Sequence, residues 1–416
     1  MRKRELLTRS AEICLVLTVI VLALVGYTKA SPTQEVTLPV GMIQPLSGPG
    51  APWGTSILRS IEMGLQEVNE KGVIIKGVTY KFKLIAEDDK GFADVAVDRV
   101  KKLIERDKIT LLLGSLYSAP LKAVAPFCAD NKILHLATGY DKKNIAARNT
   151  YTFTAGIMTD FQLPGFIDYM AGAVPNIRKA VLVHSNDTTG LTGIAVTEPE
   201  CKKRGWTTIL AGHERGAIEF GPLASKISTA APDVVFCVGT APPDFFKISK
   251  ASRDLGYKGP LCEMGGVVLS ELYKVLGDKM NPVYVSEGVG EKPYANDELI
   301  TFYSKYTKKY GVESWAVLAA IYYSWVKVYA QLLERTQSTD STMIRDLLST
   351  PGKDWYCVMG GKSYTVTERV AKEIGLESTR YLNVVWQAST WDDAAKKQVN
   401  CGWTYPYGWT GPKLPK

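Results

Sequence analysis

Two short loops carry the residues with the clearest chemical potential in this sequence of 416 residues. The first loop, residues 45–54 (PLSGPGAPWG), combines prolines that stiffen the backbone, glycines that permit close approach and the flat apolar face of Trp53. The second loop, residues 114–120 (GSLYSAP), follows the apolar run 109–113 and opens a predicted helix. Free amides and hydroxyls at a helix N-terminus suit a carboxylate. The two loops therefore predict a pocket for a small molecule with a carboxylate-like end.

Other interpretations of these loops stay open. Trp53 could plug the core at the start of a helix, and Ser118 could be an ordinary helix cap, with Pro120 tolerated in the first turn. A third segment, residues 137–141 (ATGYD), also follows a predicted strand. Because ligands of open α/β sheets collect at such strand ends, this segment is a third candidate.

The sequence lacks the motifs of the common enzyme classes. The glycines of the first loop imitate a dinucleotide-binding fingerprint, but Trp53 occupies the place of the third glycine, and Pro49 and Pro52 remove amides that a pyrophosphate needs. No Gly-x-Ser-x-Gly elbow, His-Glu-x-x-His pair or Cys-x-x-Cys motif is present. We therefore expect a binding protein without catalysis, metal or cofactor, and an exported hydrolase is the enzymatic alternative.

The pairing of the cysteines is open. In an oxidising compartment Cys357 and Cys401 could form a disulfide, as could Cys237 and Cys262 if their strands are neighbours. Buried free thiols that pack as small hydrophobic groups are the alternative for each. The cysteines beyond residue 30 are Cys128, Cys201, Cys237, Cys262, Cys357 and Cys401.

The N-terminal thirty residues have the composition of an export signal. Basic residues between positions 2 and 9 precede an almost unbroken apolar run, residues 13–25, and Thr28 and Ala30 are acceptable at the −3 and −1 positions of a signal peptidase site. We expect cleavage after Ala30 and a periplasmic mature protein. A retained membrane anchor is the alternative, although the run is shorter than the ~20 residues that a spanning helix needs.

The mature chain would be only mildly basic. Residues 1–30 hold five basic and two acidic residues, so their removal lowers the formal net charge from +8 to +5. The remaining Lys and Arg residues alternate with Asp and Glu instead of forming blocks. This pattern argues against a nucleic-acid partner.

Beyond residue 35 the sequence alternates strand-like and helix-like segments with little interruption. Such alternation predicts parallel sheets covered on both faces by helices. A chain of this length with 46% hydrophobic residues can bury more than one core, so we expect two doubly wound α/β units with a hinged ligand cleft. The predicted strands are 36–43, 80–86, 109–114 and 133–138 in the first unit, 179–184, 206–212, 233–239, 261–264 and 283–288 in the second, and 363–366 and 382–387 near the end.

The order of several short motifs carries a resemblance to a known family. Pro-Leu-Ser-Gly-Pro, with Trp-Gly shortly after it, is followed by the acidic strand end 87–89, Gly-Ser at 114–115, Ala-Thr at 137–138 and Thr-Asp at 159–160. This ordered set, which extends to the late strand 382–387, resembles the type I periplasmic binding proteins of the leucine/isoleucine/valine-binding family. The resemblance implies two Rossmann-like lobes joined by three crossovers, with the ligand between them.

The resemblance also implies a domain organisation and partners. We expect the first lobe over residues 31–155 plus 287–360, the second over 156–286 plus 361–400, and a tail at 401–416. The expected partners are a small-molecule ligand and the permease subunits of an ABC transporter in the inner membrane, with the protein itself a monomer. The alternative is a ligand-sensing module that presents its bound form to a signalling partner.

Residue by residue, the resemblance assigns a ligand-binding site. Trp53 falls where the family stacks an aromatic ring on the ligand, and Ser115 and Ser118 fall in the segment that binds the ligand's α-carboxylate. Gly139 and Asp141 fall in the segment that meets the carboxylate and ammonium ends. The full expected set is Trp53, Ser115, Tyr117, Ser118, Gly139, Asp141, Asp160, Thr189, Thr240, Glu263 and Gly265.

The second half of that site departs from the family's amino-acid pattern. The acidic residue that neutralises the ligand's amino group aligns with Gly265, and Glu263 lies two places earlier. Pocket tyrosines of the family appear as Thr189 and Thr240. A buried ammonium group would need an acid, for which Glu263 and Asp141 are the candidates. We therefore expect an organic acid or an amide rather than a simple branched-chain amino acid.

Overall fold

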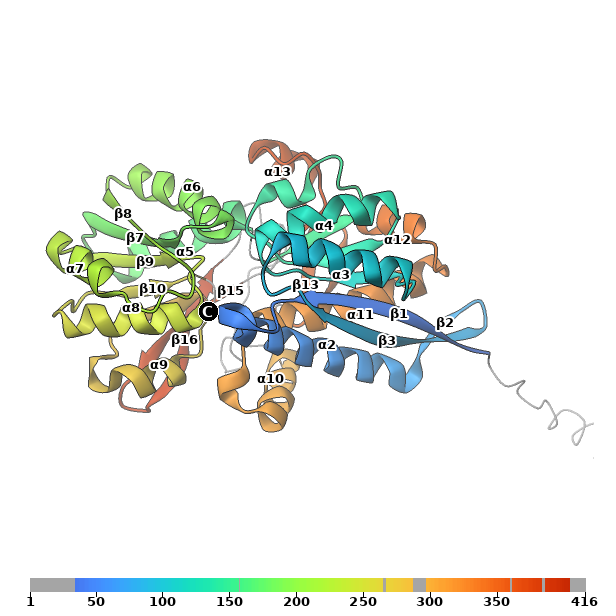
Figure 1. Ribbon diagram of the computed structural model, residues 1–416, viewed down its shortest axis with the longest axis horizontal. Coiled ribbons are helices and arrows are strands. Elements are labelled where there is room, and N and C mark those ends of the chain that lie inside the picture. The colour runs from blue at the N-terminus through green and yellow to red at the C-terminus, as the bar shows by residue number, and fades with distance from the viewer. Residues whose placement is uncertain are drawn as a thin grey trace, which may run out of the picture.

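The computed structural model describes residues 34–156, 158–264, 267–286, 297–359, 361–383 and 386–404. Two α/β bodies lie side by side in it (Figure 1). The expected signal peptide, Gly265 and the residues after Thr404 lie outside the described part of the chain. Within the described ranges, no helix combines the length and apolar character needed to cross a bilayer.

The first body contains a sheet made of β1 (Glu35–Gln44), β2 (Val73–Ile75), β3 (Val78–Asp88), β4 (Leu111–Leu113), β5 (Leu134–Ala137), β6 (Thr152–Ala155), β12 (Asp354–Cys357), β13 (Gly361–Thr365) and β14 (Tyr381–Asn383). Their order across the sheet is β12-β13-β14-β6-β5-β4-β1-β3-β2. The strands from β3 to β14 in this order are parallel. The outer strands β2, β13 and β12 are antiparallel to their neighbours.

Helices cover both faces of this first sheet. One face packs against α2 (Ala51–Lys71) and α11 (Leu318–Thr336), and the other against α3 (Ala93–Glu105) and α4 (Ser118–Asp130). Side chains of a strand alternate between faces, so Met42 enters the first cluster and Ile43 the second. Because both faces are buried, the central parallel strands are almost continuously apolar. The remaining helices are α10 (Asp297–Tyr310), α12 (Ser341–Leu348) and α13 (Glu368–Glu373).

The second body contains a sheet made of β7 (Lys179–Ser185), β8 (Thr207–His213), β9 (Val234–Val238), β10 (Leu261–Glu263), β11 (Val283–Ser286), β15 (Trp386–Asp392) and β16 (Lys397–Thr404). Their order is β16-β15-β11-β10-β9-β7-β8, with β15 and β16 antiparallel at one edge. The helices on one face are α5 (Thr159–Ala173) and α6 (Thr188–Lys203), and those on the other are α7 (Gly221–Ala230), α8 (Pro242–Asp254) and α9 (Leu269–Leu276).

The chain passes between the two sheets three times, after β6, β11 and β14. Each sheet has parallel central strands and helices on both faces (Figure 1). The expected fold class, two doubly wound α/β lobes joined by three crossovers, is confirmed.

The lobe boundaries near the C-terminus differ from the expected ones. The sequence pattern places residues 361–400 in the second lobe, but β13 and β14 hydrogen-bond into the first sheet, where β14 pairs with β6. Only β15 and β16 return to the second sheet, and β16 runs into the expected tail. A short edge strand carries no periodic signal that shows which of two sheets it joins. For the same reason β2, β12 and β16 were not predicted.

The six cysteines of the described chain carry free thiols. Cys237 and Cys262 lie on neighbouring strands, but their side chains enter core clusters on opposite faces of the sheet. Cys357 lies in the first sheet and Cys401 in the second. Neither of the two candidate disulfides is formed, so the free-thiol alternative is the one observed.

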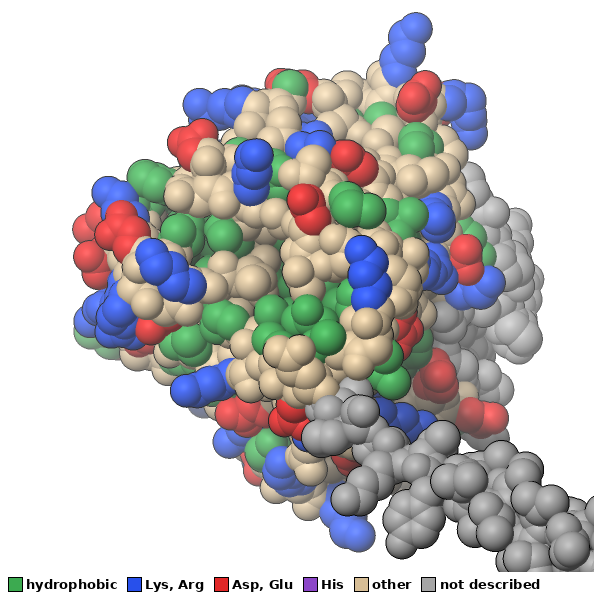
Figure 2. Space-filling view, turned by 90° about the vertical axis from the view of Figure 1, so that its right-hand side faces the viewer, with side chains coloured by type: hydrophobic (Ala, Val, Ile, Leu, Met, Phe, Trp, Pro, Cys, Tyr) green, Lys and Arg blue, Asp and Glu red, His purple; other side chains and the backbone are tan. Residues whose placement is uncertain are grey.

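Figure 2 looks onto the end of the first lobe that lies away from the second lobe. Lys and Arg side chains are interspersed there with Asp and Glu side chains and with apolar groups. Interspersed charge of this kind creates no large field of one sign over the described part of this face.

Candidate functional site

Each sheet has a point where the strand order reverses, between β1 and β4 in the first lobe and between β7 and β9 in the second. Ligands of doubly wound folds bind beyond the carboxyl ends of the strands at such a point. The loops that leave these four strands border cavities between the lobes. The candidate site is therefore the cleft between the two reversal points.

A small apolar cavity lies at the centre of this cleft. Trp53 and Tyr117 meet beside it edge to face, with ring centroids 6.3 Å apart. The cavity measures about 20 Å³, so the two lobes leave little space here. Its lining residues are Trp53, Leu116, Tyr117, Tyr140 and Leu318 from the first lobe and Thr189 and Gly239 from the second.

A larger, outer cavity of about 520 Å³ adjoins the central one at Trp53. Its apolar lining includes Phe246 of the second lobe and Trp315 of the first. Because Trp53 lines both cavities, its indole ring forms a wall between them. Trp53 is 5% exposed and also packs into the first-lobe core, so the two interpretations of this residue are compatible.

A polar cavity of about 320 Å³ adjoins the central one at Tyr117 and Thr189, which line both. Its lining comes from both lobes and includes glycine backbone next to Tyr117. The charged residues that line it are Lys90, Asp187, Glu214 and Arg215. The cleft thus has an apolar side and a charged side, with Tyr117 between them.

Two buried serines flank Leu116 and Tyr117 at the start of α4. Ser115 and Ser118 are fully buried, and neither hydroxyl has a hydrogen-bond partner among the described residues. Helix α4 begins at Ser118, and Tyr117 occupies the capping position without a side-chain cap. The interpretation of Ser118 as an ordinary helix cap is therefore wrong, because its hydroxyl lies inside the first turn. Buried hydroxyls are rarely left unpaired, so a ligand or ordered water is the natural partner of these two.

A buried carboxyl lies beside the first of these serines. Burial raises the pKa of Asp89 to about 6, although the Ser115 hydroxyl and the Gly91 amide, which donates to Oδ1 at 2.8 Å, oppose the shift. The Ser115 hydroxyl nevertheless makes no hydrogen bond of normal geometry. Gln44, at the end of β1, is equally buried, and neither polar atom of its side chain makes one either. The first-lobe side of the cleft therefore contains several polar groups that the protein leaves unsatisfied.

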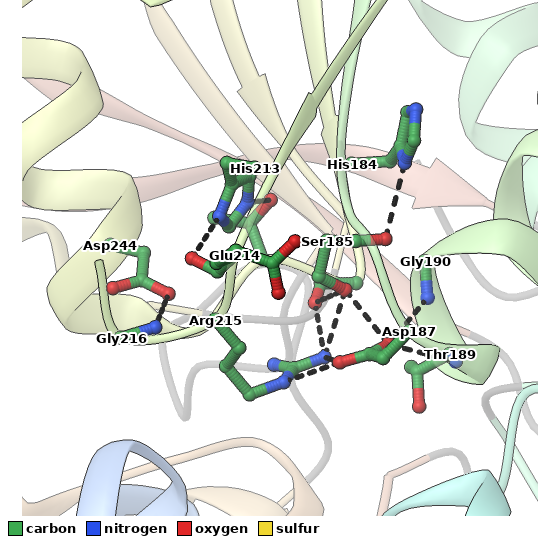
Figure 3. A network of polar contacts seen from close by, with 12 residues as sticks. His184, Ser185, Asp187, Thr189, Gly190, His213, Glu214, Arg215, Gly216 and Asp244 are labelled. Carbon is green, nitrogen blue, oxygen red and sulfur yellow. Dashed lines mark hydrogen bonds and ion pairs between the residues drawn. The ribbon is translucent and has the colours of Figure 1, made fainter. Parts of the chain in front are cut away.

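The second-lobe side contains a connected network around Arg215 (Figure 3). Arg215 Nε donates to Asp187 Oδ2 at 2.7 Å. Its Nη2 donates to the Ser185 hydroxyl and to the Gly239 carbonyl oxygen, each at 2.9 Å. The accepting groups lie at the carboxyl ends of β7 and β9, so the arginine is fixed at the second reversal point.

Asp187 is itself held by the start of α6. As the residue that caps this helix, it accepts from the Thr189 amide at 2.9 Å and from the Gly190 amide at 3.1 Å. Burial alone would raise the pKa of Asp187, but the charge of Arg215 and the Gly190 amide lower it below its usual value. Asp187 and Arg215 are therefore an ion pair built into the second lobe.

The other expected second-lobe residues lie deeper. Thr240 is fully buried, and its hydroxyl lies 3.3 Å from His213 Nε2. Glu263 is the last residue of β10 and is fully buried. Burial and the nearby charge of Glu263 raise the pKa of Tyr140. Neither Thr240 nor Glu263 is among the residues that line the three cavities.

Five further expected residues do not line these cavities, namely Ser115, Ser118, Gly139, Asp141 and Asp160. Asp141 forms an ion pair with Lys122 at 2.8 Å, and Asp160 forms one with Lys142 at 3.0 Å. A Cβ on Gly139 would lie 2.4 Å from a side-chain nitrogen of the following turn, so this glycine permits close packing there. Both acids are thus paired with lysine side chains of the protein, which leaves them poorly placed to meet a ligand's ammonium group.

Sequence reasoning missed Arg215 and Leu318 as residues of the cleft, and it included Tyr140 only as part of the third candidate segment. Arg215 follows β8, and the acid that it meets follows β7, 28 residues earlier in the chain. The available signal was a pair of opposite charges after two strands of one sheet, which the alternating pattern alone does not bring together. Leu318 begins α11, and no local pattern connects it with the first loop.

Comparison with known proteins identifies related sequences. The model of a family described as periplasmic binding protein matches residues 37–396. The Leu/Ile/Val-binding protein homolog 1 of Brucella abortus (strain 2308) is 24% identical over 334 residues, which cover 78% of this chain and 85% of the relative. The Leu/Ile/Val-binding protein of Escherichia coli (strain K12) is 25% identical over 252 residues, which cover 60% of this chain and 66% of the relative.

Solved structures share the architecture. A leucine binding protein from Thermotoga maritima matches with a TM-score of 0.74 at 18% identity, covering 89% of this chain and 99% of that one. A solute binding protein of an ABC transporter from Rhodopseudomonas palustris HaA2, in complex with p-hydroxybenzoic acid, matches with a TM-score of 0.75 at 18% identity, covering 89% and 97%. At these identities the likeness concerns the two-lobed fold.

Proposed function

Because this chain belongs to the periplasmic binding protein family, we propose that it is the solute-binding protein of an ABC importer. It captures a small carboxylate-bearing solute, a branched-chain amino acid or a related organic acid or amide, by closure of its two lobes. It has no catalytic activity. After cleavage near Ala30 the protein works as a monomer in the periplasm and delivers its ligand to permease subunits in the inner membrane.

The observation that carries this proposal is the pair of unsatisfied hydroxyls at the start of α4. Ser115 and Ser118 are fully buried in the first lobe, each is a chain neighbour of a residue that lines the central cavity, and neither hydroxyl makes a hydrogen bond of normal geometry in the described chain. Hydroxyls and free amides in the first turn of a helix favour an anionic group by hydrogen bonding and by the helix dipole. A carboxylate bound there would satisfy both hydroxyls at once.

The remaining walls of the cleft suit an apolar body attached to that carboxylate. Trp53, Leu116, Tyr140 and Leu318 line the central cavity, and Trp53 also opens onto the larger apolar one. The related proteins are named for leucine, isoleucine and valine, and one similar structure contains p-hydroxybenzoic acid. All of these molecules carry a carboxylate on an apolar body, which supports the same class of ligand here.

A thermal-shift screen of the mature protein tests the function. The panel contains branched-chain and polar amino acids, aromatic acids, short fatty acids and their amides. A ligand at 100 times its dissociation constant should stabilise the protein by about 2.7 kcal/mol, which raises the melting temperature by several degrees. Stabilisation by one or more carboxylates is the expected result, and stabilisation by none of the small solutes would contradict the proposal.

A further inference from the structure

Arg215 brings a positive charge from the second lobe to the serine segment of the first. Its guanidinium carbon lies 4.5 Å from the centroid of the Tyr117 ring. Tyr117 lies between Ser115 and Ser118 at the cap of α4, whereas Arg215 follows β8. Contact between the guanidinium and this ring therefore spans the cleft, next to the hydroxyls assigned to the ligand's carboxylate.

The second lobe fixes this guanidinium but does not saturate it. Nε and Nη2 are engaged by Asp187, Ser185 and Gly239, as Figure 3 shows. Nη1 is buried and has no hydrogen-bond partner among the described residues. A guanidinium has five N–H donors and stays charged at any ordinary pH. The nitrogen that remains is a charged donor, already oriented, that a ligand anion would satisfy.

The acid beside Arg215 does not cancel this donor. Asp187 accepts from the Thr189 and Gly190 amides and from the Ser185 hydroxyl in addition to Arg215 Nε. Its negative charge is thereby shared among several donors at the start of α6, where the helix dipole also favours it. Both Nε and Nη2 contact Asp187 Oδ2, at 2.7 and 2.6 Å, and Nη1 is the remaining nitrogen of the same rigid guanidinium.

Tyr117 offers a second unsatisfied group at the same place. Its hydroxyl is buried and makes no hydrogen bond of normal geometry in the described chain, although burial raises its pKa and the nearby Arg215 guanidinium opposes that rise. A Cβ on Gly50 would lie 2.6 Å from this hydroxyl, and a Cβ on Gly91 would lie 2.8 Å from the ring. The absence of side chains at these two glycines therefore leaves room for the ring in the position where it meets Arg215.

We propose that Arg215 is a specificity-determining residue whose Nη1, together with the Tyr117 hydroxyl and Ser118, receives the anionic group of the ligand. This inference rests on the proposed function and narrows the ligand class. Charge recognition comes from the second lobe, so a carboxylate is required and an ammonium group is not. The protein selects an acid over the corresponding neutral amide.

Titration calorimetry on the mature protein tests this role with two acid and amide pairs. The probes are 4-methylpentanoate with 4-methylpentanamide and 4-hydroxybenzoate with 4-hydroxybenzamide. The parent protein should prefer the acid, and Arg215→Met should weaken acid binding by about 10- to 150-fold while amide binding changes little. Arg215→Lys, which keeps the charge but not the fork, should recover part of the preference.

Lys258→Met is the matched control, because Lys258 is an exposed cation of the second lobe that lines none of the three cavities. It should change the acid affinity less than about twofold, since solvent and salt screen an exposed charge. Thermal unfolding of each variant without ligand establishes that it is folded.

Two results would overturn the inference while leaving the proposed function intact. An unchanged preference for acid over amide in Arg215→Met and Arg215→Lys would show that Arg215 does not recognise the negative charge of the ligand. An equal loss for acid and amide would show that Arg215 only holds the two lobes together. If none of the four calorimetry probes binds the parent protein, the inference is wrong. If no solute of the thermal-shift screen binds either, the proposed function is also contradicted.

Discussion

On the first-lobe side of the cleft, Ser115, Ser118 and Gln44 keep buried polar atoms without normal hydrogen bonds, whereas on the second-lobe side Arg215 and Asp187 are tied into one network. No hydrogen bond of normal geometry within the described chain satisfies the atoms of the first set. The second set is assembled from the carboxyl ends of two strands and the start of α6. The polar groups of the second lobe therefore stabilise the ligand-free protein more than those of the first lobe do.

The two sides of the cleft are therefore expected to contribute differently to ligand binding. Unsatisfied groups lower the stability of the ligand-free protein and gain most when a ligand satisfies them. A network that is already assembled loses little conformational freedom when the lobes close on the ligand. Breaking the Arg215–Asp187 pair should thus lower folding stability, whereas removing the unpaired hydroxyls of Ser115 and Ser118 should lower affinity with little effect on stability.

The largest expected effect on stability comes from breaking the second-lobe pair. Asp187→Ala leaves Arg215 without its acidic partner and removes the cap of α6. Breaking a buried ion pair costs about 3–5 kcal/mol, and the partial exposure of Asp187 favours the lower half of that range. Urea unfolding of the ligand-free protein measures this loss. A loss below about 1 kcal/mol would contradict a network that is assembled in advance.

A second effect comes from the buried carboxyl on the first-lobe side. The pKa of Asp89 is raised from 3.8 to about 6 in the folded protein, so the folded state binds this proton more tightly than the unfolded chain does. The resulting contribution to stability is full below about pH 4 and is lost as the pH rises through about 6. Asp89→Asn, which cannot ionise, should therefore gain about 2–3 kcal/mol relative to the parent between pH 4 and pH 7.5.

Urea unfolding of the parent and of Asp89→Asn at these two pH values measures that gain. Asparagine keeps an oxygen that can accept from the Gly91 amide, so the variant changes the charge with little change in shape. A stability difference that is the same at both pH values would show that Asp89 titrates normally.

The smallest effect on stability is expected at the two serines. Ser115→Ala and Ser118→Ala each remove a buried hydroxyl without a partner, so the free energy of unfolding should stay within about 1 kcal/mol of the parent value or increase. Thermal and urea unfolding without ligand measure this. A loss of more than about 2 kcal/mol in either variant would mean that the hydroxyl is a structural bond of the first lobe.

The fold could be predicted from the sequence because its signals are local. The central strands are apolar runs buried on both faces, and the helices between them show apolar stripes at helical spacing. The two-lobe architecture followed from that alternation and from the resemblance in motif order. The membership of 361–383 in the first sheet could not be predicted, because it depends on the pairing of β14 with β6, which is distant in sequence.

The site could be predicted only in part, for the same physical reason. Trp53 and the serine segment follow strand ends, and the fold brings strand ends together. Asp141 was a candidate for an ammonium group, but Lys122, 19 residues away, meets its carboxylate. Arg215 could not be predicted from the sequence, because its role depends on Asp187 and on Tyr117 of the opposite lobe. Contacts between side chains on different elements leave no mark in the local pattern.

Affinity for the best-binding acid of the screen, measured by calorimetry in Ser115→Ala and Ser118→Ala, tests the carboxylate site most directly. Ser252→Ala is the control, since its hydroxyl is also buried without a partner in the described chain but lies in α8, whereas Ser115 and Ser118 are chain neighbours of Leu116 and Tyr117, which line the central cavity. Loss of a hydroxyl that bonds a charged ligand should weaken binding by about 10- to 150-fold in both serine variants and leave the control unchanged. Parent-like affinity in both variants, or sub-micromolar leucine binding that collapses in Glu263→Gln, would contradict the proposed ligand class and its placement.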